Sequence, residues 1–487
     1  MPGPMSNSRP NIIFFLVDQL RYDAIGSLGV DHGQTPHIDA LVEGGVTFEN
    51  CFVTAPSCAP SRASVFTGYY PHTTGIMRNG DPWESSWVER LGRSGYHCVS
   101  IGKMHTTPFD SPCGFDDRYV VENKDRYLEG RYFIDELDKA LRAQGLIKQQ
   151  RELYRKLGDY RERLGAFTWD LPEEYHPDNF VGNAAVSWIN ETANKTPLFM
   201  QIGFPGPHPP YDPTPNFLHR FENVQLPLQE IHAYDVAKQP SSLRKLMHHN
   251  TVVDHDSLVH IINPSVDQRM RQRRHYFANV AMIDHQLGKI VKALSGQGYL
   301  DNAIIVFASD HGDCLGDHGH SQKWTMYDQV TRVPLVVYGK RFKGGRQVKD
   351  LVQLMDIGPA IMEWAKVDYP DTLEAQSVRL AVEGRHEWVG RDYVYAEQVG
   401  DINFTDCMLM TMVRNAEWKL VHFLGETDTV LFDLQNDPNE LDDLSTNQLY
   451  EERKKDLMDV LFNWRLHSQL HTRGYTNQRV NFSAESS

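Results

Sequence analysis

Five apolar runs between residues 11 and 339 constrain the fold of this chain more than any other feature. They are rich in β-branched, aromatic and aliphatic residues and cover residues 11–17, 96–101, 197–204, 303–309 and 333–339. Nearly continuous apolarity is typical of strands that are buried on both faces, as in a parallel sheet. Segments with helical spacing lie between them, at 36–44, 84–94, 179–192 and 268–296. This alternation predicts a doubly wound α/β fold, with a mixed, mostly parallel sheet between helices.

The pattern changes beyond residue 376, where the strands become short. Four such strands are predicted at 392–398, 408–414, 418–424 and 429–434, followed by a helix at 447–467. Because 487 residues exceed one ordinary core, we predict a catalytic α/β domain at 1–375 and a smaller α+β subdomain with a tail at 376–487. The subdomain would be a short antiparallel sheet plus one helix. A charge-rich stretch at 121–165 predicts a helical insertion outside the main sheet.

Charge and composition exclude several classes of partner. The formal net charge of −15 argues against nucleic acids and anionic membranes, because both bind positive surfaces. No stretch approaches the ~20 apolar residues of a membrane-spanning helix. The run at 11–17 is short for a secretion signal, and no cleavage site follows it, so we expect a buried strand and a cytoplasmic location. The six cysteines lack zinc-type spacing and are expected to be thiols in a reducing compartment.

Polar residues follow four of the five apolar runs directly. They are Asp18-Gln19, the segment 102–105, the segment 205–211 and the segment 310–319. Ligands of open α/β sheets bind at the carboxyl ends of the strands. We therefore expect these four segments, which are far apart in the sequence, to meet at one edge of the sheet.

A group of potential metal ligands stands out among these residues. Asp18, Gln19 and Asp310 offer the oxygen atoms that hard cations such as Ca²⁺ prefer. His311 shifts the preference toward a transition metal such as Mn²⁺. A lone aspartate after a strand is more often a cap or a turn residue, and spacing alone leaves both interpretations open.

The stretch SCAPSRASVFTG, residues 57–68, is typical of a helix start that binds an anion. Pro60 suits the first helical turn, where its missing N–H would be unpaired anyway. Cys58 would then lie at the positive end of the helix, and Arg62 adds a cation that can bind an oxyanion. We expect the Cys58 side chain to be too exposed for core packing. We interpret the stretch as a sulfate or phosphate site, in which Cys58 is a low-pKa thiolate nucleophile or acts less directly.

The same stretch resembles the signature of the sulfatase family, in the alkaline phosphatase superfamily: C-x-P-S-R followed by T-G. Other segments resemble sulfatase segments in the family's order, at 17–29, 95–105, 204–211, 309–337 and 431–445. The resemblance covers nearly the whole chain. It implies the family's α/β fold and the hydrolysis of organic sulfate monoesters.

The resemblance also implies roles for individual residues. Cys58 would be oxidised to formylglycine by a maturation enzyme, and the hydrated aldehyde would attack sulfur with one hydroxyl and use the second to expel sulfate. One divalent cation (Ca²⁺ or Mn²⁺) would be bound by Asp18, Gln19, Asp310 and His311, and the nucleophile would be supported by Arg62 and Lys103. His105 would abstract a proton, and the leaving group would be assisted by His208 and Lys323. Substrate contacts would come from Asn79 and Thr107. For Asn79, a plain turn residue stays the alternative.

One departure from the common pattern bears on the substrate. Most sulfatases have two adjacent acids where this chain has Asp18-Gln19, and this form resembles the branch of arylsulfatases and phosphonate monoester hydrolases. We expect an arylsulfatase-like enzyme with promiscuity. The alternatives are a phosphonate monoester hydrolase or phosphodiesterase, or an oxyanion-binding protein whose cysteine stays unconverted. Specificity is expected from 121–180, 212–265 and the tail at 471–482, and a homo-oligomer stays open.

Overall fold

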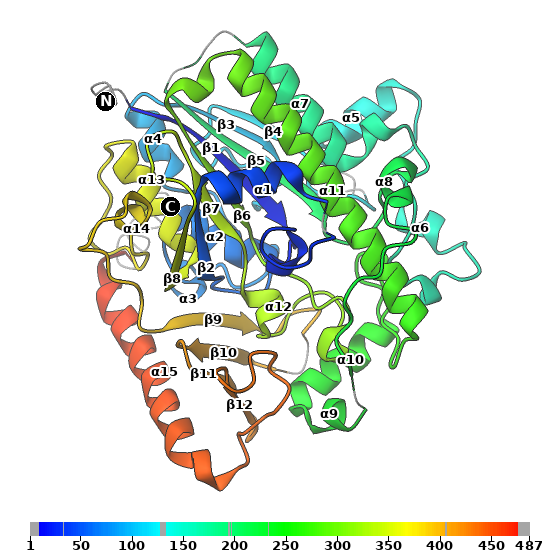
Figure 1. The fold of residues 1–487 in the computed structure, drawn as a ribbon, viewed down its shortest axis with the longest axis vertical. Coiled ribbons are helices and arrows are strands. Elements are labelled where there is room, and N and C mark those ends of the chain that lie inside the picture. Colours follow the sequence, from blue (N-terminus) through cyan, green and yellow to red (C-terminus); the bar gives the residue numbers. More distant parts are fainter. Residues whose placement is uncertain are drawn as a thin grey trace, which may run out of the picture.

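Two sheets organise the chain, and each has its own helices (Figure 1). The computed structural model describes residues 9–32, 34–126, 133–192, 195, 197–231, 233–404 and 407–475. Within these ranges, the larger sheet has eight strands in the order β4-β3-β5-β1-β6-β7-β2-β8. The smaller sheet has four strands in the order β12-β11-β10-β9.

The larger sheet is mixed and mostly parallel. Its strands are β1 Asn11–Asp18, β2 Val46–Phe52, β3 His97–Gly102, β4 Asp117–Val120, β5 Leu198–Pro207, β6 Ala303–Ser309, β7 Leu335–Tyr338 and β8 Arg346–Gln353. All pairs are parallel except those of β7, which runs antiparallel to β6 and β2. The five strands predicted from apolar runs and the predicted mixed, mostly parallel sheet are confirmed.

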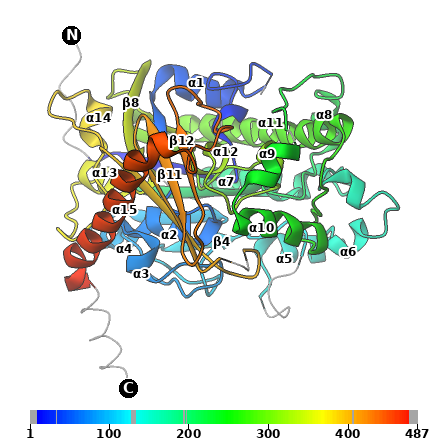
Figure 2. The same cartoon turned by 90° about the horizontal axis from the view of Figure 1, so that it is seen from below.

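Strand β1 shows why these runs are continuously apolar. Its alternate residues enter two different cores: Ile13, Phe15 and Val17 enter one, and Ile12, Phe14 and Leu16 the other. The first core is shared with α1 (Pro36–Gly44), α7 (Pro177–Glu191) and α11 (Val266–Gly296). The second is shared with α2 (Cys58–Thr67), α4 (Val88–Arg93) and α13 (Ile357–Trp364). Figure 2 shows α1 and α11 on one side of the molecule and α2, α3 and α4 on the other.

The other α-helices before β9 lie in the connections, and most of them are short. They are α3 Pro71–Thr74, α5 Glu136–Ala143, α6 Arg151–Tyr154, α8 Pro215–His219, α9 Ala233–Lys238, α10 Ser241–Val252, α12 Asp328–Thr331 and α14 Arg379–Glu383. Of these, α5 and α6 belong to the predicted insertion and lie beside the sheet (Figure 1). Residues 127–132 of the insertion lie outside the described residues, as does 476–482 of the tail. Among the described residues, no helix has the length and apolarity needed to cross a membrane.

The smaller sheet is antiparallel and lies between a helix and the larger unit. Its strands are β9 Val394–Val399, β10 Leu409–Arg414, β11 Trp418–Phe423 and β12 Thr429–Asp433. The helix α15, Glu451–His471, packs on one face through Leu457, Leu461 and Trp464. The other face packs against Trp324 and Met326. The predicted C-terminal sheet and helix are confirmed, while the domain boundary at 375 stays a prediction.

Candidate active site

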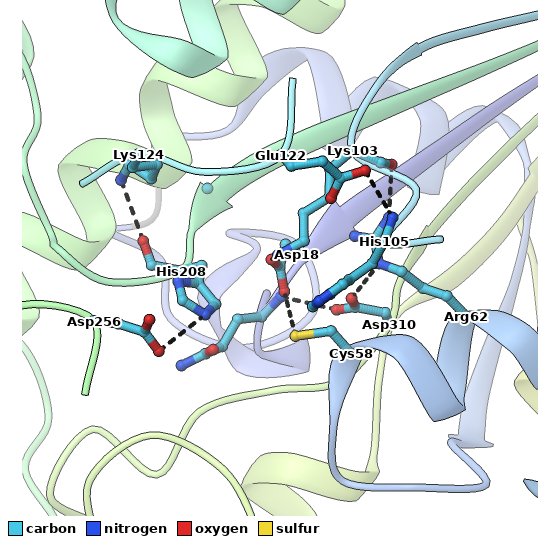
Figure 3. Close-up of polar contacts among 12 residues, drawn as sticks. Asp18, Cys58, Arg62, Lys103, His105, Glu122, Lys124, His208, Asp256 and Asp310 are labelled. Atoms are coloured by element: carbon cyan, nitrogen blue, oxygen red, sulfur yellow. Dashed lines mark hydrogen bonds and ion pairs between the residues drawn. The ribbon is translucent and has the colours of Figure 1, made fainter. Parts of the chain in front are cut away.

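The polar segments that follow the central strands meet at one edge of the larger sheet (Figure 3). Strand β1 ends at Asp18, and Lys103 follows β3. Strand β5 ends just before His208, and β6 ends just before Asp310. Since these four strands are neighbours in the order β3-β5-β1-β6, their carboxyl ends deliver the four segments to one place. The predicted convergence is confirmed.

Cys58 is the first residue of α2 and points into this place. Its exposed fraction is 1%, so the interpretation of Cys58 as an exposed side chain is wrong. The next residue of the helix, Ala59, donates its N–H to Asn79 Oδ1 at 2.9 Å. This bond satisfies one of the unpaired donors that every helix start carries. Asn79 thus caps α2 beside Cys58, and its predicted contact with substrate stays a prediction.

Potential metal ligands surround the sulfur atom. One ligand atom from each of Asp18, Cys58, Asp310 and His311 lies within 4.8 Å of all the others. His311 Nδ1 donates to the Gly312 carbonyl at 2.9 Å, so the lone pair is on Nε2. This Nε2 lies 3.6 Å from Asp18 Oδ1 and 3.8 Å from Asp310 Oδ1. Two carboxylates and one imidazole nitrogen within this range fit a divalent cation.

Gln19 lies in the same place, with φ at +67°. Its Nε2 donates to Asp313 Oδ2 at 2.7 Å, which fixes the direction of the amide. The opposite atom, Oε1, accepts a hydrogen bond from Lys323 Nζ at 3.0 Å. Its backbone N–H donates to Asp310 Oδ1 at 3.0 Å. The role of Gln19 as a metal ligand stays a prediction.

Three cations balance the buried carboxylates. Lys103 forms an ion pair with Asp18, and Lys323 Nζ lies 3.0 Å from Cys58 Sγ. Arg62 Nε donates to Asp310 Oδ2 at 2.6 Å, and Nη1 donates to the Lys103 carbonyl at 2.8 Å. Arg62 Nη2 is buried and has no partner among the described residues. A buried guanidinium donor without a partner fits an anionic oxygen beside it.

The pocket does not favour a cysteine thiolate. Burial and the nearby charge of Asp18 raise the pKa of the Cys58 thiol to about 11. Lys323 and Lys103 act in the opposite sense but do not outweigh burial. The low-pKa thiolate that the helix start suggested is therefore wrong for this pocket.

The two candidate proton carriers lie on either side of this cluster. His105 has φ at +66°, and its N–H and that of Met104 donate to Glu122 Oε1 at 2.9 and 3.1 Å. Burial and the charge of Lys103 lower the pKa of His105 well below its usual value, so its ring is neutral. His208 Nδ1 donates to the Pro209 carbonyl at 2.8 Å. Glu122 thus holds the backbone of His105, and the Pro209 carbonyl holds the ring of His208.

Thr107 contacts Trp83 through its backbone. Its carbonyl accepts a hydrogen bond from the Trp83 N–H at 2.8 Å, in an isolated antiparallel bridge. The predicted contact of its side chain with substrate stays a prediction.

Comparisons with known proteins decide the family. The sulfatase family model matches residues 10–367, which is most of the chain. The chain belongs to the sulfatase family. A second model, N-sulphoglucosamine sulphohydrolase, C-terminal, matches residues 316–467. This sulfatase is a sulfuric ester hydrolase.

Relatives and solved structures agree with this family. The sulfatase is 30% identical to an arylsulfatase of Clostridium perfringens over 467 residues, covering 93% of this chain and 94% of that protein. It is 25% identical to a choline-sulfatase of Rhizobium meliloti, covering 91% and 84% of the two chains. The crystal structure of a phosphonate monoester hydrolase of Agrobacterium radiobacter has the same fold, with a TM-score of 0.80, 24% identity and coverage of 94% and 96%.

Sequence reasoning about this sulfatase missed several residues of the site. Glu122 and Lys124 lie in the charge-rich stretch 121–165, which predicts a helical insertion outside the main sheet and gave no sign of a site. Asp256 lies in a polar loop with no strand before it, so the strand-end rule gave no signal. Asp313 lies within the predicted segment 310–319 but was not singled out in it, although it follows β6 by only four residues. Its bonds to Gln19 and to the Tyr211 hydroxyl, at 2.7 and 2.6 Å, mark it as a residue that orients the site.

Proposed function

We propose that this sulfatase hydrolyses organic sulfate monoesters of the aryl type, releasing inorganic sulfate through a formylglycine made from Cys58 and one divalent cation. One observation supports this proposal above all. One ligand atom from each of Cys58, Asp18, Asp310 and His311 lies within 4.8 Å of the others, although these residues come from three distant segments. The arylsulfatase relative supports the aryl substrate. A sulfate monoester is an anion, and it suits this pocket because three cations and the start of α2 surround the sulfur atom of Cys58.

The metal and the modified residue belong to this proposal. Asp18, Gln19, Asp310 and His311 would hold the cation, Ca²⁺ or Mn²⁺, which when bound stabilises negative charge on the reacting oxygens. Formylglycine at position 58 supplies, once hydrated, the attacking hydroxyl and a second hydroxyl for its own release. The sulfur of Cys58 stands here for those oxygen atoms.

The chain's own residues would bind the ester and move protons. Arg62 and Lys103 would hold the nucleophile and the anion, using Arg62 Nη2, which has no partner among the described residues. His105, whose ring is neutral, would take the proton that frees the sulfate. His208 and Lys323 would stabilise or protonate the leaving oxygen.

A phosphonate monoester or phosphodiester substrate is the second candidate. Gln19 is uncharged where most sulfatases have an acid, so the site is less anionic and can accept other singly charged esters. Phosphonate monoester hydrolases share this fold, and a multifunctional alkaline phosphatase superfamily protein of Trinickia caryophylli is 26% identical over 509 residues. We propose this activity as a secondary one.

Mass spectrometry and paired kinetics test the proposal. In protein made together with a formylglycine-generating enzyme, the peptide containing Cys58 should be ~18 Da lighter than its cysteine form. The converted protein should hydrolyse an aryl sulfate faster than an aryl phosphonate monoester, and Cys58→Ala should hydrolyse neither. A fully unconverted but active protein would contradict the formylglycine, and a faster phosphonate reaction would reverse the order of the two substrates.

The cellular setting is part of the same proposal. We propose a cytoplasmic enzyme that is matured there by the formylglycine-generating enzyme. Cell fractionation combined with the mass of the Cys58 peptide in each fraction tests this. Converted enzyme outside the cytoplasm would contradict it.

A further inference from the structure

A loop far from the strand ends brings a carboxylate to His208, the residue proposed to assist the leaving group. Asp256 Oδ2 lies 3.5 Å from His208 Nε2 (Figure 3). On the other side of the ring, Nδ1 donates to the Pro209 carbonyl at 2.8 Å. Both ring nitrogens therefore face acceptors. Only an imidazolium could donate to both of them, because a neutral ring has only one N–H to donate.

Charged residues of the insertion hold Asp256 in this position. Arg126 Nη1 lies 2.6 Å from Asp256 Oδ1, so the carboxylate bridges Arg126 and His208. Arg151 Nη2 lies 3.6 Å from the same oxygen. Burial raises the pKa of Asp256, but the charges of His208 and Arg126 outweigh it and hold the pKa well below its usual value. Asp256 therefore stays ionised beside the ring.

The turn that carries Asp256 has an unfavourable backbone conformation. Asp256 and Ser257 have φ values of +55° and +58°, in the left-handed region that side chains with a Cβ disfavour. Two bonds from the insertion keep the turn in place. Ser257 Oγ donates to Asp125 Oδ2 at 2.5 Å, and Arg151 Nη1 donates to the Asp254 carbonyl at 2.9 Å. Such conformations persist where surrounding contacts impose them, and they concentrate at functional sites.

The backbone of His208 is held by the same part of the insertion. Lys124 Nζ donates to the His208 carbonyl at 3.2 Å and to the Pro210 carbonyl at 2.7 Å. The ammonium group also pairs with Asp212 at 2.5 Å. The short segment 124–126 thus fixes His208 twice, through its own carbonyl and through Asp256.

The other charges around His208 explain why it needs a carboxylate. Burial and the charges of Lys323 and Lys103 hold the pKa of His208 well below its usual value, so the pocket on balance disfavours the protonated ring. Asp256 and Asp18 act in the opposite sense. Asp18 already pairs with Lys103 and is proposed as a metal ligand. Asp256 is therefore the carboxylate that remains available to stabilise positive charge on His208.

We propose that Asp256 is a positioning residue that holds the His208 ring at the leaving oxygen and stabilises its protonated form against the nearby cations. In the assisted step, the attacking oxygen at position 58, which has already lost its proton, forms a bond to sulfur while the bond from sulfur to the alcohol oxygen breaks. The electron pair of the broken bond goes to the alcohol oxygen, which takes the proton from Nε2 and leaves a neutral imidazole. The inference rests on the proposed function, because it takes His208 as the proton donor.

A series of aryl sulfates whose phenols differ widely in acidity tests this role with the converted enzyme. Poor leaving groups depend most on the proton, so Asp256→Asn should lower kcat/KM about 10- to 100-fold for the least acidic phenol and much less for the most acidic. The matched control is Asp254→Asn in the same turn. Asp254 bonds to Arg155 and Tyr160, each at 2.7 Å, and its variant should lower kcat/KM by one common factor across the series.

Two further variants separate the possible failures. In a His208→Asn background, Asp256→Asn should have no additional effect, because Asp256 acts through this ring. Arg126→Gln keeps the carboxylate but loosens it, so it should show a weaker form of the same leaving-group dependence, even if Asp256→Asn does not fold.

The outcomes are distinct for the inference and for the proposed function. A steep dependence in His208→Asn with a uniform loss in the Asp256 and Arg126 variants overturns the inference alone. The inference alone is also overturned if Asp256→Asn causes its full loss of kcat/KM in the His208→Asn background. If the loss of kcat/KM in His208→Asn does not depend on the acidity of the phenol, the proposed role of His208 is overturned, and this inference with it.

Discussion

Glu122 accepts the N–H groups of Met104 and His105 at the turn where β3 leads into the site. At the scale of single residues, this carboxylate compensates for the left-handed conformation of His105. Its second oxygen, Oε2, is buried without a partner among the described residues. Glu122 therefore acts on the backbone and lets the His105 ring face the pocket.

We predict that Glu122→Ala lowers kcat by about 10-fold or more with little change in KM, because a proton carrier that is displaced by about 1 Å loses rate rather than binding. Glu122→Gln keeps one acceptor oxygen for the two N–H groups and should retain most of the activity. Steady-state kinetics on one aryl sulfate measures both variants. Equal losses in the two would show that the negative charge, and not the hydrogen bonds, is what matters.

Single residues of the site differ in how far sequence predicts them. Asp18 and Asp310 could be found because each directly follows a buried strand, and Cys58 because Pro60 and Arg62 mark a helix start. Asp256 could not be found, since it acts through the His208 ring from a loop with no periodic pattern. The pKa of Cys58 could not be predicted from the sequence either, because it depends on complete burial and not on the neighbouring residues in the sequence.

At the scale of elements, α2 is the helix on which the site depends. It begins at Cys58 and ends where Gly68 adopts φ +79°, with the Gly68 N–H donating to the Ser64 carbonyl at 2.8 Å. Nine of its ten residues are buried, so the helix is fixed on all sides and has little freedom to move Cys58. Both ends are therefore set by specific residues, Asn79 at the start and Gly68 at the end.

We predict that Gly68→Ala lowers the free energy of unfolding by about 1–3 kcal/mol, because the new Cβ is strained in this conformation. It would also lie 2.2 Å from Leu373 Cδ2, so that side chain must shift. Gly158→Ala is the control, since its Cβ would meet no atom of the described residues within 4 Å and its effect should be near zero. Urea unfolding compares the two, and equal stabilities would contradict the role of Gly68 as the helix end.

The elements that sequence missed share a physical cause. Strands β2, β4 and β8 contain charged or polar residues because parts of them reach solvent, so they lack the apolar runs of the central strands. The edge position of β4 and β8 explains this for two of them. Strand β1, in contrast, is buried along all eight residues and was evident from its composition.

At the scale of the whole molecule, the proposed cation would join parts of the chain that are distant in sequence. We predict that removing divalent cations with a chelator abolishes activity and lowers Tm by a few degrees, because a cation at 100 times its Kd adds about 2.7 kcal/mol to stability. Adding Mn²⁺ or Ca²⁺ back should restore both. Asp310→Asn should lose the response of Tm to the cation, and an unchanged Tm in the wild-type protein would contradict the metal site.

The smaller sheet is also tied to the segment that carries Lys323. Lys419 on β11 donates to the Met326 carbonyl at 2.9 Å and to Asp328 Oδ1 at 2.5 Å, and it also pairs with the buried Glu440. Trp324, directly after Lys323, packs into the core that this sheet closes. A gene fragment that stops before β9 would encode every proposed catalytic side chain and still yield a defective enzyme, so truncation or fusion designs must keep both units together.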